Sequence, residues 1–391
     1  MLSRKRPCPV CGASKLQEFH HLLQIPVHCN LLYASREEAV EAPRGDLQLL
    51  FCQRCGHVFN GAYDPALMEY TQAYENSLHF SPRFQRYAEE LADHLIDRYA
   101  IRQRTVIDIG CGKGDFLALL CERGENRGIG FDPSFVPEYV SGPVREKMTI
   151  VQDFYSARYA DRQAELIVCR HVLEHIPDPA AFVRDVRTSI GDARSTVVFF
   201  EVPNVLYTLK DLGIWDLIYE HVSYFSPASL SHLFRAEGFD VTGVQDLYGG
   251  QFLGIEGRPG SSAASATTQD LALLADLVQQ FSGAYQTKVA EWISRFEAME
   301  AAGQRAVVWG GGSKGVTFLN TLRPDAVVTH MVDINPRKQG MFVAGTGQPI
   351  VAPEELRPVN PDAVIIMNPI YRTEIEAAVR ELGISSEVLV G

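Results

Sequence analysis

Apolar and polar positions divide the middle of the chain into short hydrophobic runs and longer amphipathic segments. Residues 81–100 repeat apolar side chains every three or four positions behind Ser81 and Pro82, which predicts a helix. The runs that follow alternate with helical patterns, so we expect a parallel, doubly wound α/β sheet. The predicted strands are residues 105–110, 128–132, 149–153, 165–172 and 195–202.

The last part of this sheet has a different pattern. A helical segment at 229–239 precedes residues 240–258, which read as two strands that meet at Gly249 and Gly250. An antiparallel hairpin on the edge of a parallel sheet departs from a plain dinucleotide-binding fold.

The C-terminal third begins a second pattern. Residues 258–270 have the composition of a linker, and residues 271–299 predict one long amphipathic helix. Residues 305–322 then read as a strand, a glycine turn and a helix, and further strands are expected within 327–336 and 361–369. We expect a second, smaller Rossmann-like α/β domain here.

Size and charge narrow the function classes. With 391 residues the chain exceeds one hydrophobic core, and its 36 basic against 48 acidic side chains give a net charge of −12. The basic cluster is confined to residues 3–6, which disfavours binding to a nucleic-acid backbone. No apolar run approaches the length of a membrane span, and none follows the N-terminus, so we expect a cytoplasmic protein without membrane contact.

Four of the eight cysteines form two C-x-x-C pairs, each followed by glycine: Cys8 with Cys11, and Cys52 with Cys55. Four thiolates in this arrangement match a structural Zn²⁺ site that leaves no position open for catalysis. Chance pairs of buried cysteines and a redox motif are the weaker alternatives.

Residues 106–120 read as a buried strand, a glycine-rich loop from Gly110 through Gly112 to Gly114, and a helix. Glycines at the carboxyl end of such a strand let a cofactor approach the backbone closely. The pattern alone also suits NAD or flavin.

Acidic residues at three successive strand ends sharpen this interpretation. Asp108 lies inside the first strand, and Asp132 ends the second, where its carboxylate suits two ribose hydroxyls. Asp153 ends the third strand, placed to bond an adenine amino group, and Phe154 to cover the base. Taken singly, each aspartate can be an ordinary solvated strand end.

With the glycine loop, the acids and the hairpin, residues 80–258 resemble the class I S-adenosylmethionine (SAM)-dependent methyltransferases. The resemblance implies SAM as cofactor, with Arg170 and His171 beside its methionine part. Glu174 and His175 read as residues that cap or brace the loop; they resemble a metal pair, but their spacing offers no further ligand.

The paired cysteines, "DIGCGKGDFL", "EHVSY", "GGGSKGVTFLN" and "VDINPRKQG" together resemble the zinc-binding sugar C-methyltransferases of deoxysugar biosynthesis. This implies a zinc-binding domain at 1–75, a methyltransferase domain at 76–258 and a substrate-binding domain at 259–391. The implied acceptor is a nucleotide-activated keto sugar, and the implied assembly a monomer or small homo-oligomer.

Methyl transfer to a carbon next to a ketone needs a base to form the enolate and a donor to its oxygen. We expect His221 to be the base, because an ordinary histidine pKa lies near neutral pH. Glu220 is expected to orient its ring, and Tyr219 or Tyr224 to donate to the sugar oxygen. A structural histidine is the alternative.

The resemblance also implies roles for two further groups of residues, one before the first helix and one in the last domain. Tyr74 and Ser77 correspond to the family's lid over cofactor and acceptor, although His79 and Phe80 beside them can equally staple the start of the helix.

In the last domain the glycine turn at 310–315 suits an anion at a helix N-terminus, or is a relic that only packs. We expect a nucleotide there, with the substrate-binding residues Ser313, Lys314, Asp333 and Asn368.

Three other functions stay open. An O-methyltransferase acting on a small-molecule hydroxyl fits the same cofactor site. A zinc-containing nucleic-acid methyltransferase is opposed by the net charge of −12. A non-catalytic binding or assembly protein is opposed by the intact set of acids.

Overall fold

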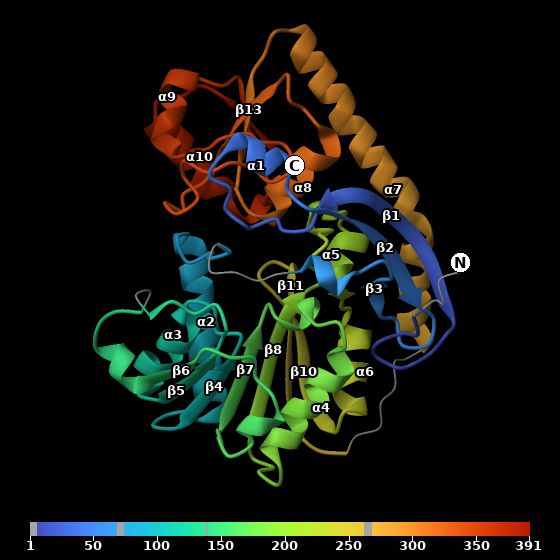
Figure 1. The fold of residues 1–391 in the computed structure, drawn as a ribbon, viewed down its shortest axis with the longest axis vertical. Coiled ribbons are helices and arrows are strands. Elements are labelled where there is room, and N and C mark those ends of the chain that lie inside the picture. The colour runs from blue at the N-terminus through green and yellow to red at the C-terminus, as the bar shows by residue number, and fades with distance from the viewer. Residues whose placement is uncertain (1–5, 69–73, 138–139, 262–267) are drawn as a thin grey trace.

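The computed structural model describes residues 6–68, 74–137, 140–261 and 268–391. Its strands form a four-stranded sheet, a seven-stranded sheet and a five-stranded sheet. The seven-stranded sheet lies at one end of the molecule, the five-stranded sheet at the other, and the four-stranded sheet beside the region where they approach each other (Figure 1).

The seven-stranded sheet has the order β10-β11-β8-β7-β4-β5-β6. Six of the seven strands run in one direction, and β11 alone in this sheet runs opposite to them, paired antiparallel with both β8 and β10. The parallel sheet and its terminal hairpin are therefore confirmed. The strands are β4 (Thr105–Ile109), β5 (Arg127–Phe131), β6 (Met148–Val151), β7 (Leu166–Arg170), β8 (Val197–Pro203), β10 (Phe239–Leu247) and β11 (Phe252–Pro259).

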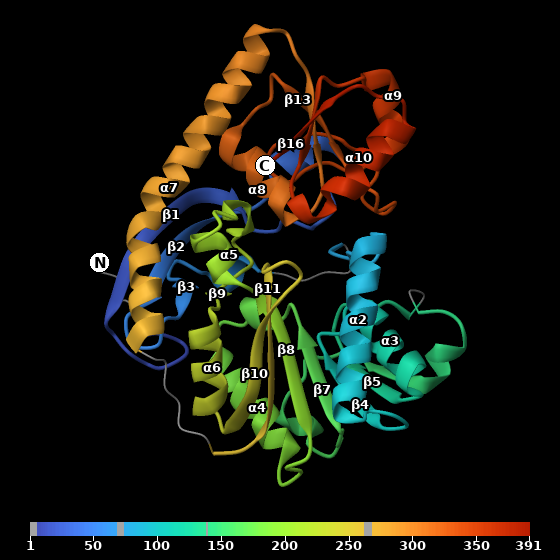
Figure 2. The same cartoon turned by 180° about the vertical axis from the view of Figure 1, so that it is seen from behind.

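Helices cover both faces of this sheet (Figures 1 and 2). Side chains alternate between the faces, so Val106 packs against α2 and α3 while Ile107 packs on the side of α4 and α6. The predicted helix at 81–100 is confirmed as α2. The helices are α2 (Pro82–Tyr99), α3 (Asp115–Gly124), α4 (Pro179–Ile190) and α6 (Pro227–Ala236), whereas α5 (Val205–Leu209) packs in the core of the four-stranded and five-stranded sheets.

The four-stranded sheet combines distant parts of the chain. Strands β1 (Leu16–Pro26), β2 (Arg44–Cys52) and β3 (Val58–Asn60) form an antiparallel meander, with the short helix α1 (Arg36–Val40) between β1 and β2. The fourth strand, β9 (Ser223–Tyr224), comes from the connection between β8 and α6 and pairs with β3. This sheet therefore needs more than the first 75 residues.

The five-stranded sheet is parallel, in the order β14-β13-β12-β15-β16. This confirms the second Rossmann-like unit. Its elements are β12 (Ala306–Trp309), α8 (Ser313–Leu322), β13 (Val328–Val332), β14 (Ile350–Val351), α9 (Leu356–Val359), β15 (Ala363–Ile366), α10 (Arg372–Glu381) and β16 (Glu387–Val390).

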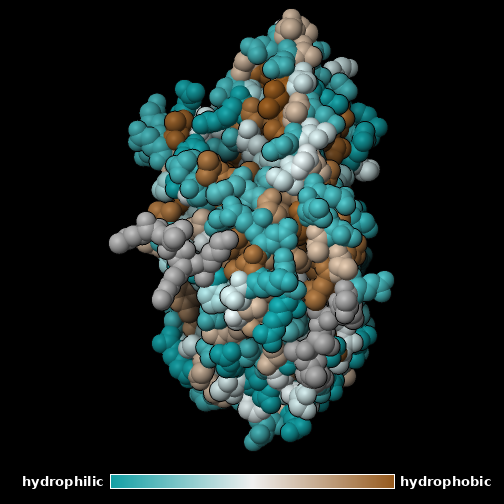
Figure 3. All heavy atoms as spheres, turned by 90° about the vertical axis from the view of Figure 1, so that its right-hand side faces the viewer, coloured by the Kyte–Doolittle hydropathy of each residue, from teal (hydrophilic) through white to brown (hydrophobic). Residues whose placement is uncertain are grey.

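The long helix α7 (Thr268–Ala301) runs along the curved β1–β3 sheet and reaches the five-stranded unit (Figure 2). Its buried aromatic side chains Phe281, Tyr285, Trp292 and Phe296 join both in one core. The face that Figure 3 shows, which is the right-hand side of Figure 1, is largely hydrophilic, with hydrophobic residues in small separate patches. Within the described ranges, no helix has the length and hydropathy of a membrane span.

Candidate active site

A cavity of about 930 Å³ lies between the carboxyl ends of the seven-stranded and five-stranded sheets. Both glycine-rich loops, residues 74–81 and the loops after β7 and β8 contribute to its walls. Except for Tyr219, Glu220, Tyr224 and the four paired cysteines, every predicted site residue lines this one cavity. A volume of this size can hold a cofactor together with a second small molecule.

The first glycine-rich loop links β4 to α3 and exposes its backbone to the cavity. Gly110 adopts φ +70°, and a Cβ there would meet Val172 Cγ2 at 2.2 Å. Gly112 adopts φ +53°, and a Cβ on it would have no atom within 4 Å. The loop therefore needs glycine for two reasons, conformation at both positions and space at the first.

Two predicted cofactor residues lie directly beneath this loop. The Asp132 carboxylate accepts hydrogen bonds from Gly112 N at 2.8 Å and from Ser134 N at 2.8 Å. Asp108 is buried, and burial raises its pKa to about 7, although the Arg170 charge opposes the rise. Asp132 thus holds the loop from the cavity side.

The predicted adenine end of the site lies at the carboxyl end of β6. Asp153 forms an ion pair with Arg158 and accepts a hydrogen bond from the Tyr159 hydroxyl. Phe154 is 69% exposed although it borders the cavity. An exposed aromatic ring beside a cavity offers a face on which a flat ligand can stack.

Arg170 and His171, at the end of β7, are held by a buried glutamate that the sequence analysis missed. Glu201 Oε1 lies 2.9 Å from Arg170 Nη2 and 2.7 Å from His171 Nε2, and Tyr87 donates to its other oxygen. His171 adopts φ +55°, a left-handed conformation that is rare outside glycine. The signal for Glu201 was a lone acidic residue within the apolar run "VVFFEV".

Opposite charges stabilise the ionised forms of both Glu201 and His171. Burial favours a higher pKa for Glu201, but Arg170 and His171 outweigh it and lower the pKa to about 2. Burial would lower the pKa of His171, but hydrogen bonds to Glu174 and Glu201 raise it to about 9. His171 is therefore a cation at neutral pH.

The fold brings His221 to Glu174 and His175, a proximity that their spacing in the sequence does not show. One ligand atom from each of the three residues lies within 4.8 Å of the others. His175 Nδ1 lies 2.9 Å from the Glu220 carbonyl oxygen, which fixes the ring. Glu174 Oε1 also lies 3.6 Å from His171 Nδ1, so a protonated histidine already balances its charge.

His221 is 9% exposed and borders the cavity. Burial lowers the pKa of its imidazole well below the ordinary value, and the electrostatic effects of the neighbouring His175, His171 and Lys314 act in the same direction. The ring is consequently neutral at neutral pH, with one of its nitrogens unprotonated.

The second glycine-rich loop, between β12 and α8, faces the same cavity. Asp333 Oδ2 accepts from Gly311 N at 2.8 Å, as Asp132 does in the first loop. Lys314 forms an ion pair with Asp216, and Ser313 begins α8. The Asn368 amide exchanges two hydrogen bonds of 2.9 Å with Gln251, so this predicted substrate residue already links the two units.

Family comparisons agree with this division of the chain. A model described as "Methyltransferase domain" matches residues 84–244, and one described as "C-methyltransferase C-terminal domain" matches residues 266–386. The chain is a SAM-dependent methyltransferase.

Known proteins are similar to different lengths of this chain. C-methyltransferase NovU of Streptomyces niveus is 24% identical across 94% of this methyltransferase and 90% of its own length. A ubiquinone biosynthesis O-methyltransferase of Methylococcus capsulatus is 28% identical across 37% of this chain and 66% of its own. Among solved structures, the mitomycin 7-O-methyltransferase MmcR overlaps 48% of this chain and 56% of its own, with 16% identity and a TM-score of 0.39.

The methyltransferase carries the predicted cysteine cluster at the base of the four-stranded sheet. Cys8 Sγ lies 3.7 Å from Cys55 Sγ, and Cys11 Sγ lies 3.6 Å from Cys52 Sγ. Sulfur atoms around a tetrahedral zinc with bonds of about 2.3 Å are about 3.8 Å apart, so the four thiols fit the ion. The glycine after each pair adopts a positive φ, and its amide bonds back to the first cysteine of its pair.

The predicted partners of His221 are wrong. Glu220 is fully buried and points away from the His221 ring, with its carboxylate 3.5 Å from His28 Nδ1 and 3.3 Å from Cys29 N. Residues 219 and 220 lie in a turn, and these contacts hold the Glu220 carboxylate at the N-terminal segment, where it is not placed to orient the imidazole of His221.

The two tyrosines are also not available to an acceptor. The Tyr219 hydroxyl accepts from Asp64 N at 2.8 Å, and its ring packs beside Tyr63. The Tyr224 hydroxyl donates to the Ile218 carbonyl at 2.9 Å, inside the core. Neither side chain lines the cavity.

Tyr74 and Ser77 border the cavity as the resemblance implied. Tyr74 shares a hydrogen bond of 3.5 Å with Asn30, and Ser77 Oγ accepts from His79 N at 3.4 Å. The His79 ring meets Phe84 edge-on with a centroid distance of 5.1 Å, which also supports the alternative that His79 braces the start of α2.

Proposed function

We propose that this methyltransferase moves the SAM methyl group to a carbon beside the keto group of a nucleotide-activated deoxysugar, with His221 as general base. The observation that carries the proposal is a buried, neutral imidazole facing a cavity that both glycine-rich loops share. The net charge of −12 supports a small-molecule acceptor over a nucleic acid.

The chemistry requires little beyond alignment and proton removal. A ring nitrogen of His221 takes the proton from the carbon next to the ketone, and the resulting enolate carbon attacks the sulfonium methyl group. S-adenosylhomocysteine leaves, and the proton stays on His221 until solvent removes it. Since Tyr219 and Tyr224 face away, we assign the donor to the enolate oxygen to the neighbouring His175.

On the cofactor side we assign SAM to the first loop. Asp132 takes the ribose, Asp153 and Phe154 the adenine, and Arg170 with His171 the methionine end, with the latter two held by Glu201. The remaining proposed cofactor contacts are Tyr74, Ser77, Asp108, Gly110 and Gly112.

On the acceptor side, Ser313, Lys314, Asp333 and Asn368 are assigned to the nucleotide. Backbone amides at the start of the ten-residue helix α8 favour an anionic group.

The direct test is incubation with methyl-labelled SAM and a panel of keto-sugar nucleotides, each paired with its reduced alcohol. Label on carbon, seen by NMR with the keto forms alone, supports the proposal. Label on oxygen means O-methylation, and absence of label from the whole panel rejects this acceptor class.

His221→Asn then tests the base. We expect kcat to fall by about 10²–10⁴-fold while the affinity for S-adenosylhomocysteine changes less than about twofold. The matched control is His21→Asn, since His21 is half-exposed and distant from the cavity. A His221→Asn enzyme with the wild-type rate would remove this residue from the mechanism.

We further infer that Cys8, Cys11, Cys52 and Cys55 hold a structural zinc ion. Metal analysis of the purified protein should find about one zinc per chain, and Cys52→Ser should lower that content. A protein purified without chelators that contains no metal argues against this assignment.

A further inference from the structure

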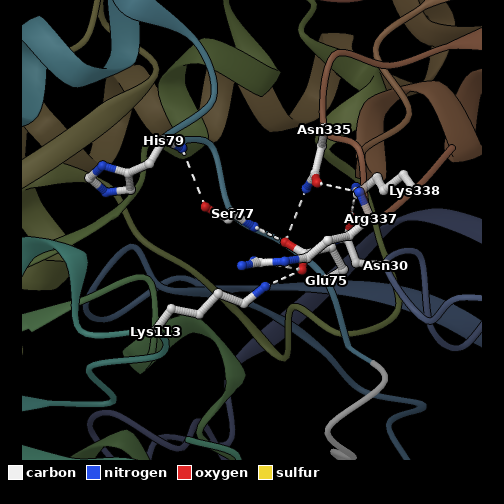
Figure 4. A network of polar contacts seen from close by, with 8 residues as sticks. All are labelled: Asn30, Glu75, Ser77, His79, Lys113, Asn335, Arg337 and Lys338. Atoms are coloured by element: carbon white, nitrogen blue, oxygen red, sulfur yellow. Dashed lines mark hydrogen bonds and ion pairs between the residues drawn. The ribbon is translucent and has the colours of Figure 1, made fainter. Parts of the chain in front are cut away.

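Glu75 is a buried residue that three distant parts of the chain contact, two of them through its carboxylate (Figure 4). Its side chain is contacted by Lys113 from the first glycine-rich loop and by Asn335 and Arg337 from the five-stranded unit. The catalytic scheme above gives this residue no task.

The backbone of Glu75 is held by the N-terminal segment. Glu75 N donates to the Asn30 carbonyl at 2.9 Å, and Leu31 forms an isolated bridge with Tyr74. Asn30 Oδ1 in turn accepts from Lys338 Nζ at 3.0 Å. The N-terminal segment therefore holds the backbone that carries this carboxylate.

On the cofactor side, Lys113 stands between Gly112 and Gly114 and forms an ion pair with Glu75 Oε2. The amide of Gly112 is the one that Asp132 accepts. Any cofactor that orders this loop therefore also orders the partner of Glu75.

On the other side, Asn335 Nδ2 donates to Glu75 Oε1 at 3.0 Å, and Arg337 Nη1 lies 3.3 Å from Oε2. Asn335 N donates to Asp333 Oδ1 at 2.8 Å, and Asp333 Oδ2 accepts from Gly311 N at 2.8 Å. An unbroken series of polar contacts thus runs from one glycine-rich loop to the other through Glu75.

The charge on Glu75 makes these contacts strong. The side chain is 3% exposed, and burial acts to raise its pKa, but Lys113 and Asn335 outweigh burial and hold the pKa below the ordinary value. An ionised carboxylate gives charge-assisted hydrogen bonds, roughly twice as strong as neutral ones. Neutralising it leaves the contacts of Lys113 and Arg337 without their shared anion.

We propose that Glu75 is a positioning residue that couples the two glycine-rich loops, so that cofactor bound at the first loop tightens the second. By linkage, a ligand at the second loop strengthens cofactor binding by the same factor. This coupling goes beyond methyl transfer and is independent of which acceptor the enzyme uses.

Hydrogen–deuterium exchange of the full-length protein with saturating S-adenosylhomocysteine tests the coupling without any acceptor. In the wild type we expect slower exchange at residues 110–116 and, through Glu75, a slowing of about fivefold or more at 310–315 and 333–338. In Glu75→Gln, residues 110–116 should still be protected, while the slowing at the distant peptides should fall below about twofold.

Lys113→Met provides a second variant that breaks the same series from the other end, should Glu75→Gln fail to fold. Glu374→Gln is the matched control, because Glu374 also joins the two units, through Ser81 Oγ at 3.2 Å, but has no contact with Lys113. It should keep the wild-type response.

The outcomes are distinct. Loss of the distant response in Glu75→Gln or Lys113→Met, with retention in Glu374→Gln, supports the coupling. An unchanged distant response in a folded Glu75→Gln or Lys113→Met protein overturns it, as does a wild type whose distant peptides ignore the cofactor. The acceptor assignment can fail in the label-transfer assay while this result stands.

Discussion

The two glycine-rich loops occupy equivalent places in their sheets, yet their surroundings differ. Each follows a central parallel strand, β4 or β12, and precedes a helix. In each, an aspartate from the neighbouring strand accepts a loop amide at 2.8 Å: Asp132 from Gly112, and Asp333 from Gly311.

The two loops differ in how closely side chains from other segments approach their backbone. The position of a Cβ on Gly112 is empty to 4 Å, whereas a Cβ on Gly311 would meet Asp333 Oδ2 at 2.8 Å. Lys338 Nζ also donates to the Gly311 carbonyl at 2.9 Å. The first loop thus offers bare backbone to a ligand, while the protein's own side chains cover part of the second. A glycine motif indicates where another group can come close to the backbone. Residues elsewhere in the chain determine whether that group is a ligand or a side chain of the protein.

The largest effect should come from the buried ions beside the first loop. Glu201→Gln leaves Arg170 and His171 buried without their anion, so we expect a loss of about 3–5 kcal/mol in the free energy of unfolding. Denaturant titration measures it. Asp97→Asn, which breaks an exposed pair with Arg102, is the control and should cost less than about 1 kcal/mol. Equal losses would mean that this network does not stabilise the loop.

The next largest difference should come from replacing one glycine of each loop by alanine and comparing the stability of the two variants. Gly110→Ala forces a positive φ on alanine and a clash with Val172, so we expect a loss of about 2–4 kcal/mol. Gly312 has φ −93°, and a Cβ there would meet Asn30 Oδ1 only at 4.0 Å, so Gly312→Ala should cost less than about 1 kcal/mol. Thermal unfolding distinguishes them. Adding Val172→Ala should recover part of the first loss, and a double variant as unstable as Gly110→Ala would reject the clash.

Gly112→Ala should affect binding more than folding. Its Cβ projects into open space at φ +53°, so strain of about 1 kcal/mol is expected in the free energy of unfolding. The same methyl group occupies the surface that we assign to SAM. Calorimetric titration with S-adenosylhomocysteine should therefore show at least about tenfold weaker affinity. Unchanged affinity would mean that the cofactor does not contact this backbone.

The smallest effect concerns pH. The pKa of His221 lies well below its ordinary value in the folded enzyme, so the imidazole stays unprotonated as pH falls through 6.5. At saturating cofactor, kcat should change less than about twofold between pH 7.5 and 6.5 and decline at lower pH. An acid limb centred at pH 6.5 or above would indicate a different base.

Local patterns predicted the elements well, and long-range contacts explain the failures. Strand periodicity and glycine turns are encoded within a few residues, so β4 and its loop were found. Glu201 and Glu75 acquire their roles from partners far away in the chain, which periodicity does not reveal. Glu220 was misassigned because its carboxylate is held by His28 and by Cys29 N, which lie far from it in the sequence. The pairing of β9 with β3 likewise joins segments more than 160 residues apart.

That same pairing has a consequence for how such enzymes can be divided or recombined. Strand β9 lies two residues after His221, and its neighbour in the sheet lies three residues after Cys55. The N-terminal module that carries the four cysteines therefore helps to position the segment that holds His221, the proposed base. A chimera that exchanges the N-terminal module between related enzymes should therefore be active only if the segment from α5 to α6 comes from the same parent enzyme.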